Sequence, residues 1–149
     1  MLKKIFGLLI IAALSIRAND YSGKIGLSFT LFDHTEAGLK IHLLPNYCLN
    51  PSVYFSKTGD QKTFKAALGN QIYLFSLAAL DQYINAKLSF DKPDNGHGNV
   101  YFAGNYGVQY LFNDVFAVFG EAGLRAGPNG DNSSLSFFNT DVGVTFYLR

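Results

Sequence analysis

The sequence predicts an all-β fold, an up-and-down barrel of eight antiparallel strands preceded by a short leader. Three observations predict it. Only 15% of the 149 residues are charged, well below the roughly 25% of ordinary soluble domains. Aromatic residues make up another 15%, and there are 15 glycines. Apolar and small or polar residues alternate with a period of two along most of the chain, which is typical of strands with two unlike faces.

The first 18 residues are expected to be a cleaved signal peptide, which leaves residues 19–149 as one barrel domain. Two lysines precede an apolar run over 5–14, and Ala18 supplies a small residue at the cleavage point. The run is shorter than the roughly 20 residues that a membrane-spanning helix needs. A buried N-terminal helix is the alternative interpretation.

The charge balance argues against several function classes. The leader holds three of the 12 basic residues and none of the 11 acidic ones, so the domain carries nine basic and eleven acidic side chains, a net charge of −2. This weakly acidic balance gives no basis for nucleic-acid binding. Cys48 is the single cysteine, which excludes an internal disulfide. Zinc-ligand spacings, phosphate-binding loops and dinucleotide motifs do not occur, so we expect neither a metal site nor a cofactor.

The N-terminal half is expected to hold the first five strands. Strands over 24–32 and 37–43 form a hairpin around the polar break at 33–35. A third strand is expected around Val53 and Phe55, after a turn region over 45–51. The fourth runs from Phe64 to about Phe75, with a kink or bulge at Gly69 and Asn70, and the fifth covers 83–90. An amphipathic helix is the alternative for 77–88, because leucines and Ile84 there also recur at spacings of three and four.

The C-terminal half alternates more regularly. Strands are expected over 100–110, 116–125 and 137–148, with a turn at 113–114 and a polar loop at 127–134. An even number of strands returns both termini to the same end of the barrel. The loops at 33–35, 57–61, 91–98 and 127–134 then lie at one end, and the connections near 45–51, 76–82 and 112–114 at the other.

Alternation alone fits two opposite barrels. A soluble, lipocalin-like barrel turns its apolar face inward, whereas an outer-membrane barrel turns it toward lipid. A water-facing surface is about 25–35% charged, but the polar face here is mostly Gly, Ser, Thr, Asn and Ala. We therefore predict a transmembrane barrel whose lipid-facing side chains include Leu27, Phe29, Val118, Val142 and Val144.

Two segments resemble the small eight-stranded outer-membrane barrels of the OmpA/OmpX-like family. They are GVQYLFNDVFAVFGEAGLR at 107–125 and the closing VGVTFYL at 142–148. The chain departs from the family at its last residue, where Arg149 replaces the usual aromatic residue. The resemblance implies a multi-pass protein of the Gram-negative cell outer membrane. It also implies contact with outer-membrane lipids, and delivery by periplasmic chaperones and the barrel-assembly machinery.

Several charged residues share the phase of the inner face. Beside Lys24 and His42, they are Lys40, Lys87, Glu121, Arg125 and Asp141. Isolated buried charges are costly, so these groups must pair. We expect Glu121 to meet Lys40 or Lys87, and Arg125 to meet Asp141, in a structural ion-pair network. A gated polar path or proton relay is the alternative. Phe119, Phe137 and Tyr147 share this face and are expected to close the lumen.

We therefore expect a protein with a structural or surface-interaction role and no catalytic residues. A small pore or transport-accessory protein is one alternative. A lipid A-modifying barrel enzyme is the other, but deacylases of this size carry a His-x-Ser step. None of His34, His42 and His97 is followed two residues later by serine. The sequence identifies no ligand for the outer loops.

Overall fold

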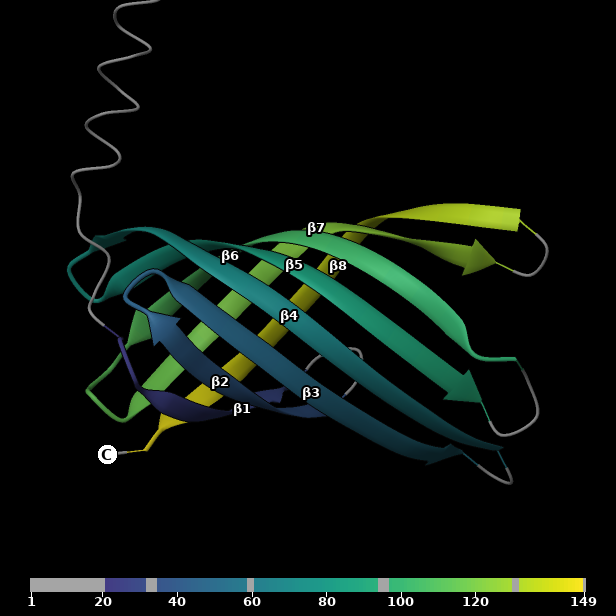
Figure 1. Ribbon diagram of the computed structural model, residues 1–149, viewed down its shortest axis with the longest axis horizontal. Helices are drawn as coiled ribbons and strands as arrows, with labels where there is room; N and C mark the ends of the chain where they lie inside the picture. Colours follow the sequence, from purple (N-terminus) through teal and green to yellow (C-terminus); the bar gives the residue numbers. More distant parts are fainter. Residues whose placement is uncertain (1–20, 32–34, 59–60, 94–96, 130–131, 149) are drawn as a thin grey trace, which may run out of the picture.

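The computed structural model describes residues 21–31, 35–58, 61–93, 97–129 and 132–148. Within them, eight antiparallel strands pair in sequence order and β8 returns to β1, which closes a barrel (Figure 1). The strands are β1 (Ile25–Thr30), β2 (Glu36–Leu44), β3 (Tyr47–Thr58), β4 (Gln61–Leu77), β5 (Leu80–Pro93), β6 (Asn99–Leu111), β7 (Phe116–Asn129) and β8 (Asn132–Tyr147).

The predicted all-β barrel class is confirmed. The helix considered for 77–88 does not form, because β4 ends at Leu77 and β5 begins at Leu80. No helix among the described residues is long and apolar enough to cross a membrane. The predicted signal peptide over 1–18 lies outside the described residues.

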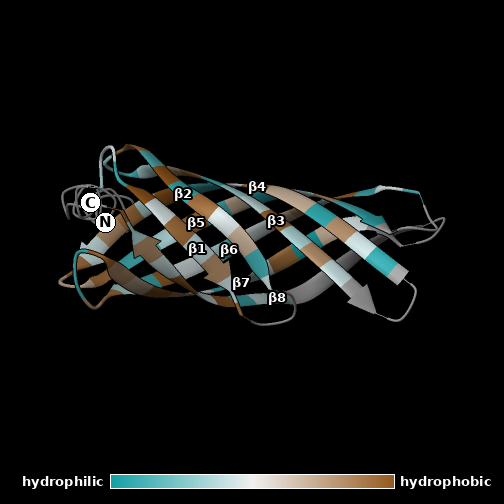
Figure 2. Ribbon diagram, turned by 90° about the horizontal axis from the view of Figure 1, so that it is seen from below, coloured by the Kyte–Doolittle hydropathy of each residue, from teal (hydrophilic) through white to brown (hydrophobic). Residues whose placement is uncertain are grey.

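The two faces of the sheet differ as the alternation predicts. Along β6, Asn105, Gly107 and Gln109 are buried in the barrel, whereas Tyr106 and Val108 are exposed on the outside. Figure 2 shows the same alternation of hydrophilic and hydrophobic residues along the ribbons. All five residues predicted to face lipid lie on the outer face, since each alternates with buried neighbours of β1, β7 or β8. The barrel is therefore polar inside and apolar outside.

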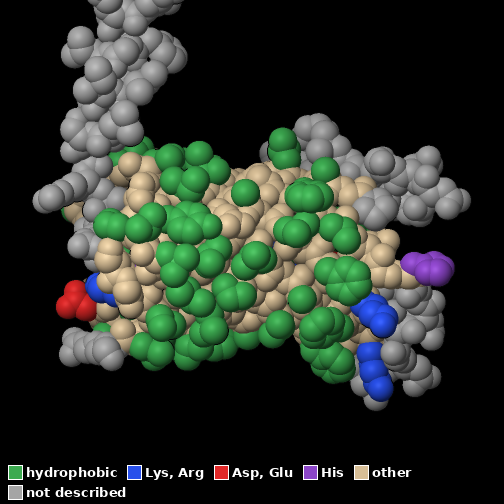
Figure 3. Space-filling model, viewed as in Figure 1, with side chains coloured by type: hydrophobic (Ala, Val, Ile, Leu, Met, Phe, Trp, Pro, Cys, Tyr) green, Lys and Arg blue, Asp and Glu red, His purple; other side chains and the backbone are tan. Residues whose placement is uncertain are grey.

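The outer face forms an apolar belt of membrane dimensions. On β6 the outward residues from Val100 to Tyr110 carry no charge. At about 3.3 Å per residue and a strand tilt of about 40°, these ten steps span roughly 25 Å along the barrel axis. This matches the height of the apolar band of outer-membrane barrels, about 25 Å. On the face shown in Figure 3, charged side chains are visible only toward the two ends.

Aromatic side chains border this belt at both ends. At the end with the short turns, neighbouring rings pack in the order Tyr110, Phe112, Phe116 and Phe146, with centroids 5.0–5.5 Å apart. Near the opposite end, four exposed phenylalanines come from β3 to β6, namely Phe55, Phe64, Phe90 and Phe102. Two aromatic girdles around an apolar band are typical of transmembrane barrels.

Two side-chain amides, those of Asn70 and Gln82, lie on the outer face, and a tyrosine hydroxyl bonds to each. Tyr47 donates to Asn70 Oδ1 at 2.8 Å. Tyr106 donates to the amide oxygen of Gln82. A polar group that lies in hydrocarbon without a hydrogen-bond partner costs roughly several kcal/mol of stability. These pairs reduce the cost of placing the two amides on an apolar face.

The turn predicted over 45–51 is wrong at its C-terminal end. β3 already begins at Tyr47, and Pro51 lies within it, opposite Leu68 of β4. Pairing between β2 and β3 joins Ile41 to Leu49 and resumes only at Gly38 and Ser52. Proline has no backbone N–H to donate. The barrel accommodates it where the β2–β3 pairing is interrupted.

The kink predicted at Gly69 and Asn70 is also wrong. β4 keeps an unbroken register there with both β3 and β5. The structure explains the glycine differently, because a Cβ at position 69 would lie 3.0 Å from Oδ1 of Asn85. Gly69 makes room for an inward amide, and the register shifts lie elsewhere, between Tyr73 and Phe75 for example.

The predicted loops at 57–61, 91–98 and 127–134 are shorter than expected. Strands extend into all three, so that β3 ends at Thr58, β5 at Pro93 and β7 at Asn129. Both described chain ends lie at the end of the barrel with the short turns, opposite these hairpins (Figure 1). The long hairpins therefore project from one end only.

A charge on the outer belt tests which way the faces point. Val142 is 38% exposed on the outer face and lies opposite Gly120. Val142→Arg should lower the stability of the refolded barrel in lipid vesicles by about 2–4 kcal/mol, the cost of arginine near the bilayer midplane. Val142→Leu is the matched control and should refold like the wild type. Equal urea midpoints for the two variants would show that this face does not contact lipid.

Candidate functional site in the barrel lumen

The inner face gathers the polar and charged side chains into a continuous core. Its fully buried members include Lys40, Gln71, Asp81 and Gln109, each with an exposed fraction of 0%. A barrel of eight strands is just wide enough for side chains to fill. The lumen is therefore a packed polar interior, with an aromatic plug near the chain termini and two small cavities toward the long hairpins.

Glu121 of β7 lies at the centre of this interior. Its carboxylate accepts hydrogen bonds from Tyr83 Oη at 2.9 Å, from Asn85 Nδ2 at 2.9 and 3.1 Å, and from Gln71 Nε2 and Asn105 Nδ2 at 3.2 and 3.1 Å. No lysine or arginine among the described residues forms an ion pair with it. Neutral donors from β4, β5 and β6 thus hold the buried charge.

Glycine 107 allows this arrangement. It pairs with Glu121 across β6 and β7, and a Cβ at this position would collide with the ring of Tyr83. The tyrosine can therefore lie flat across the lumen and point its hydroxyl at the carboxylate. A larger residue at position 107 would displace the Tyr83 ring, whose hydroxyl donates to the Glu121 carboxylate at 2.9 Å.

Lys40 of β2 is the second buried charge. Its Nζ donates to Oε1 of Gln109 at 2.7 Å. The same ammonium lies 4.4 Å from the ring centroid of Phe119 and 5.4 Å from that of Tyr83. Cation–π contacts are stronger when the pair is shielded from water. One amide and two aromatic rings therefore take the place of a carboxylate partner.

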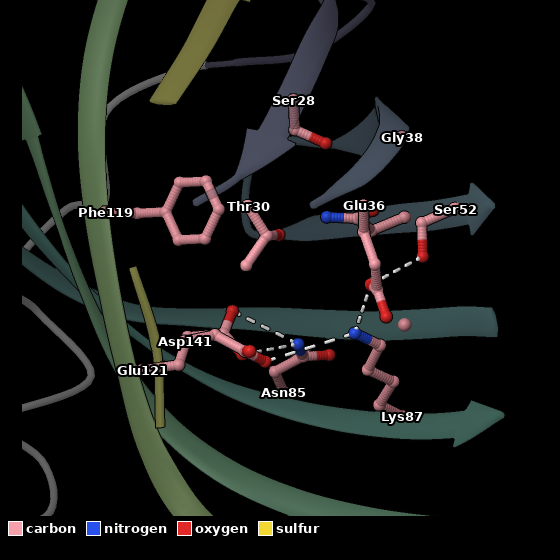
Figure 4. A pocket seen from close by; sticks show the side chains of 12 residues that line it. Ser28, Thr30, Glu36, Gly38, Ser52, Asn85, Lys87, Phe119, Glu121 and Asp141 are labelled. Carbon is pink, nitrogen blue, oxygen red and sulfur yellow. Dashed lines mark hydrogen bonds and ion pairs between the residues drawn. The ribbon is translucent and has the colours of Figure 1, made fainter. Parts of the chain in front are cut away.

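The ion pairs lie on the hairpin side of Glu121, around Glu36 of β2 (Figure 4). Its carboxylate binds Lys65 Nζ at 2.7 Å and Lys87 Nζ at 2.6 Å, and accepts a bond from Ser52 Oγ at 3.1 Å. Lys87 also lies 4.0 Å from Asp141. This group of two lysines and two acids connects β2, β4, β5 and β8 across the lumen.

A second ion pair lies beside this group. Arg125 Nη2 of β7 meets Asp91 Oδ2 of β5 at 3.0 Å, and its guanidinium lies 3.9 Å from the centroid of the Tyr101 ring. β6 separates the two strands, so the pair crosses the inner face of one strand. Stacking on Tyr101 holds the planar guanidinium in place.

The opposite half of the lumen is closed by an aromatic plug. Tyr21, which precedes β1, is 1% exposed and stacks on His42 with centroids 4.6 Å apart. Tyr147 lies 5.5 Å from Tyr21, and Tyr73 lies at the same distance. Gly23, at φ +75°, turns the chain so that Tyr21 can enter the barrel before β1 begins.

Hydrogen bonds tie the plug to the strands. Tyr21 donates its hydroxyl proton to Asp81, to which Ser76 also donates. Gln109 Nε2 donates to Tyr147 Oη at 3.0 Å and to Tyr21 Oη at 3.3 Å. Because Gln109 also accepts from Lys40, one amide connects the plug to the buried ammonium.

The remaining space is small. One cavity of about 20 Å³ lies between Glu36, Lys87, Glu121 and Asp141. A second of the same volume lies nearer the hairpins, beside Arg125 and Asn139. A volume of about 15 Å³ on this measure holds one water molecule. Each of these two cavities thus suits a single water molecule.

The structure places all five predicted network residues, Lys40, Lys87, Glu121, Arg125 and Asp141, on the inner face, but the predicted pairs are wrong. Glu121 contacts neither Lys40 nor Lys87 within ion-pair distance, and Arg125 pairs with Asp91 instead of Asp141. Phe119 and Tyr147 are buried on the inner face, with exposed fractions of 5% and 2%, whereas the side chain of Phe137 lies outside the described part of the chain. That these residues close the lumen stays a prediction.

Sequence reasoning missed Glu36, Lys65 and Tyr21. Glu36 precedes Lys40 by four residues and therefore shares its face, a signal that was present in the alternation. Lys65 belongs to a strand whose phase was left open by the supposed kink. Tyr21 precedes the first strand, and no alternation extends to it.

The histidines and acids do not form a metal site in the described residues, where no three His, Cys, Asp or Glu side chains gather around one point. Of the histidines, His42 is buried in the plug and His97 is exposed at the hairpin end. His34 lies outside the described residues.

Comparisons with known proteins support the fold alone. No protein-family model matches the chain, and no curated protein matches it. A solved structure titled "De novo design of transmembrane beta-barrels" is 14% identical, covers 87% of this chain and 99% of its own, and has a TM-score of 0.60. The solution structure of the de novo designed TMB2.3 is 12% identical, covers 85% and 95%, and has a TM-score of 0.54. The chain thus shares its architecture with designed transmembrane barrels, whereas no family match supports the OmpA/OmpX-like resemblance.

The environment of Glu121 predicts a large loss of stability in Glu121→Gln. A glutamine amide would turn its NH2 toward donors that now bond to a carboxylate oxygen. Hydrogen bonds to charged groups contribute about 1.5–3 kcal/mol each, so the loss of two should cost about 3–6 kcal/mol. Urea unfolding in detergent measures it. Asp114→Asn, at an exposed acid in the β6–β7 turn, is the control and should leave the midpoint unchanged. A Glu121→Gln midpoint equal to the control would remove the structural role of this carboxylate.

Proposed function

We propose that the protein is an integral β-barrel of the bacterial outer membrane with a structural or surface-interaction role. The observation that carries the proposal is the inverted barrel, with an apolar belt outside that is free of charge along β6 from Val100 to Tyr110, and with buried ions inside. A soluble barrel with this surface would expose a contiguous apolar area far above the few hundred Å² typical of monomers. The likeness to designed transmembrane barrels supports a membrane environment for the belt.

The location rests on the predicted leader and on the barrel itself. A chain exported by residues 1–18 would cross the inner membrane and meet the outer membrane from the periplasm. Periplasmic chaperones and the barrel-assembly machinery would then deliver and insert it. The long hairpins would face outward, because both termini lie at the opposite end of the barrel (Figure 1). These hairpins are the parts through which the protein would contact its surroundings.

The packed lumen favours a closed barrel rather than a pore. The aromatic plug and the Glu121 cluster lie in series along the axis, and the cavities beside them hold about one water molecule each. The plug also supports a non-enzymatic role. His42, a candidate base for lipid chemistry, is 1% exposed and stacked on Tyr21, so a lipid on the outer face would not contact it.

Membrane extraction tests the location directly. The expressed protein should fractionate with the outer membrane and migrate faster on gels before heating than after, because a folded barrel resists detergent until it is heated. Migration that does not change with heating, or recovery in the soluble periplasmic fraction, would contradict the proposal. Unchanged lipid A masses after expression would argue against an enzyme, and a new lipid A species would establish one.

The closed lumen predicts that the purified protein forms no conducting channel. Planar bilayers containing the refolded barrel should show no stable single-channel steps, and liposomes containing it should not swell in sugar solutions. A general porin added to the same bilayer serves as the positive control. Reproducible steps from the protein itself would favour the pore alternative.

A further inference from the structure

The outer face of β4 and β5 brings two lysines together at the hairpin end. Lys62 and Lys92 are both exposed, and the register pairs Lys92 with Phe64, two residues along β4 from Lys62. Diagonal neighbours of this kind have Cβ atoms about 7 Å apart, within reach of long side chains. The two ammonium groups thus lie close enough to bind one anionic group together.

An apolar wall continues from these lysines toward the middle of the belt. Phe64 and Phe90 are 44% and 41% exposed on the same face, and Phe90 pairs with Ala66. Leu68 and Leu88, which pair with each other, extend the wall by another step. The surface is therefore cationic at its outer edge and hydrocarbon-like below it.

The connection between β5 and β6 adds an exposed imidazole at the same end of the barrel. Gly98 packs on the Phe90 ring so closely that a Cβ would lie 2.5 Å from it. His97 precedes this glycine and is exposed. Figure 3 shows the resulting concentration of Lys or Arg and His side chains at the end of the face opposite the C-terminus, next to the apolar field.

Among the described residues of this region, the acidic side chain points the other way. Asp91 precedes Lys92, so it faces the lumen, where it binds Arg125 at 3.0 Å. Among the described residues, neither Lys62 nor Lys92 forms an ion pair. The alternation of the strand thus directs the acid inward and the base outward at the edge of the belt.

We propose that Lys62, Lys92 and His97, above Phe64 and Phe90, bind the phosphate groups of a lipid in the surrounding leaflet. In the outer leaflet of a bacterial outer membrane this would be a phosphorylated glycolipid of the lipid A type. Lysines near a membrane surface attract anionic headgroups, and the acyl chains of such a lipid would lie along the phenylalanine and leucine wall. This site rests on the proposed membrane location, and it adds a preference for phosphorylated lipid to the proposed function.

Native mass spectrometry of the full-length mature barrel in neutral detergent tests this site. The barrel is titrated with bisphosphorylated lipid A, with the same lipid after removal of both phosphates, and with inorganic phosphate. A lysine near a charged surface contributes about 1 kcal/mol, or about fivefold in affinity. Lys62→Gln/Lys92→Gln should therefore weaken lipid A binding by roughly 25-fold. Lys62→Arg/Lys92→Arg keeps both charges and should bind like the wild type.

The outcomes separate the site from the membrane location. Preference for the phosphorylated lipid that is lost in the glutamine variant and kept in the arginine variant supports the site. Equal binding of both lipids, an unaffected glutamine variant, or inorganic phosphate binding as tightly as lipid A would overturn it. Heat-dependent gel migration is recorded for each sample. A barrel whose gel migration changes on heating but that shows no lipid preference contradicts the site alone. A wild type whose migration never changes on heating contradicts the membrane location as well.

Discussion

The hydrogen-bonded seam between β1 and β8 is the constraint on which the rest of the structure depends. Five residue pairs join the two strands, from Gly26 and Tyr147 to Thr30 and Gly143, and Leu31 and Leu148 donate one further bond at each end. Closure pairs β8 with β1, so that the barrel has no open sheet edge at this seam, which is the condition for a sheet to lie in lipid. Because the closed barrel has only eight strands, its lumen is narrow.

A narrow lumen decides which residues the inner face holds. Small residues occur where another side chain must cross, as Gly107 does beneath Tyr83 and Gly143 beside Phe119. Charged residues occur where several strands can supply partners, as around Glu121 and Glu36. Because successive side chains of a strand point to opposite faces, the residues between the inward polar ones point outward and form the apolar belt. The lysines at the edge of the belt follow from this alternation too, since Asp91 takes the inward position next to Lys92.

The sequence was sufficient for the class of fold and for the faces of the strands, but not for contacts across the lumen. Alternation in β1, β6 and β7 assigned inward and outward residues correctly, because facing depends on position within one strand. The partners of Glu121 come from β4, β5 and β6. Their height along the barrel axis depends on the register between strands and on strand tilt, and the residue pattern of one strand predicts neither. The sequence predicts a turn at Pro51, whereas interrupted pairing with β2 accommodates this residue within a strand. The plug residue Tyr21 precedes all alternation and left no signal.

The proposed membrane barrel depends on contact between its apolar outer face and lipid. A spin-label scan along β6 in a Cys48→Ser background, with the barrel in vesicles, tests it most directly. We predict that labels at Gly104, Tyr106 and Val108 collide often with oxygen and rarely with a water-soluble nickel complex. Labels at Asn105 and Gln109 should be protected from both. High nickel accessibility at the outward positions, or a scan without a period of two, would contradict contact between this face and lipid.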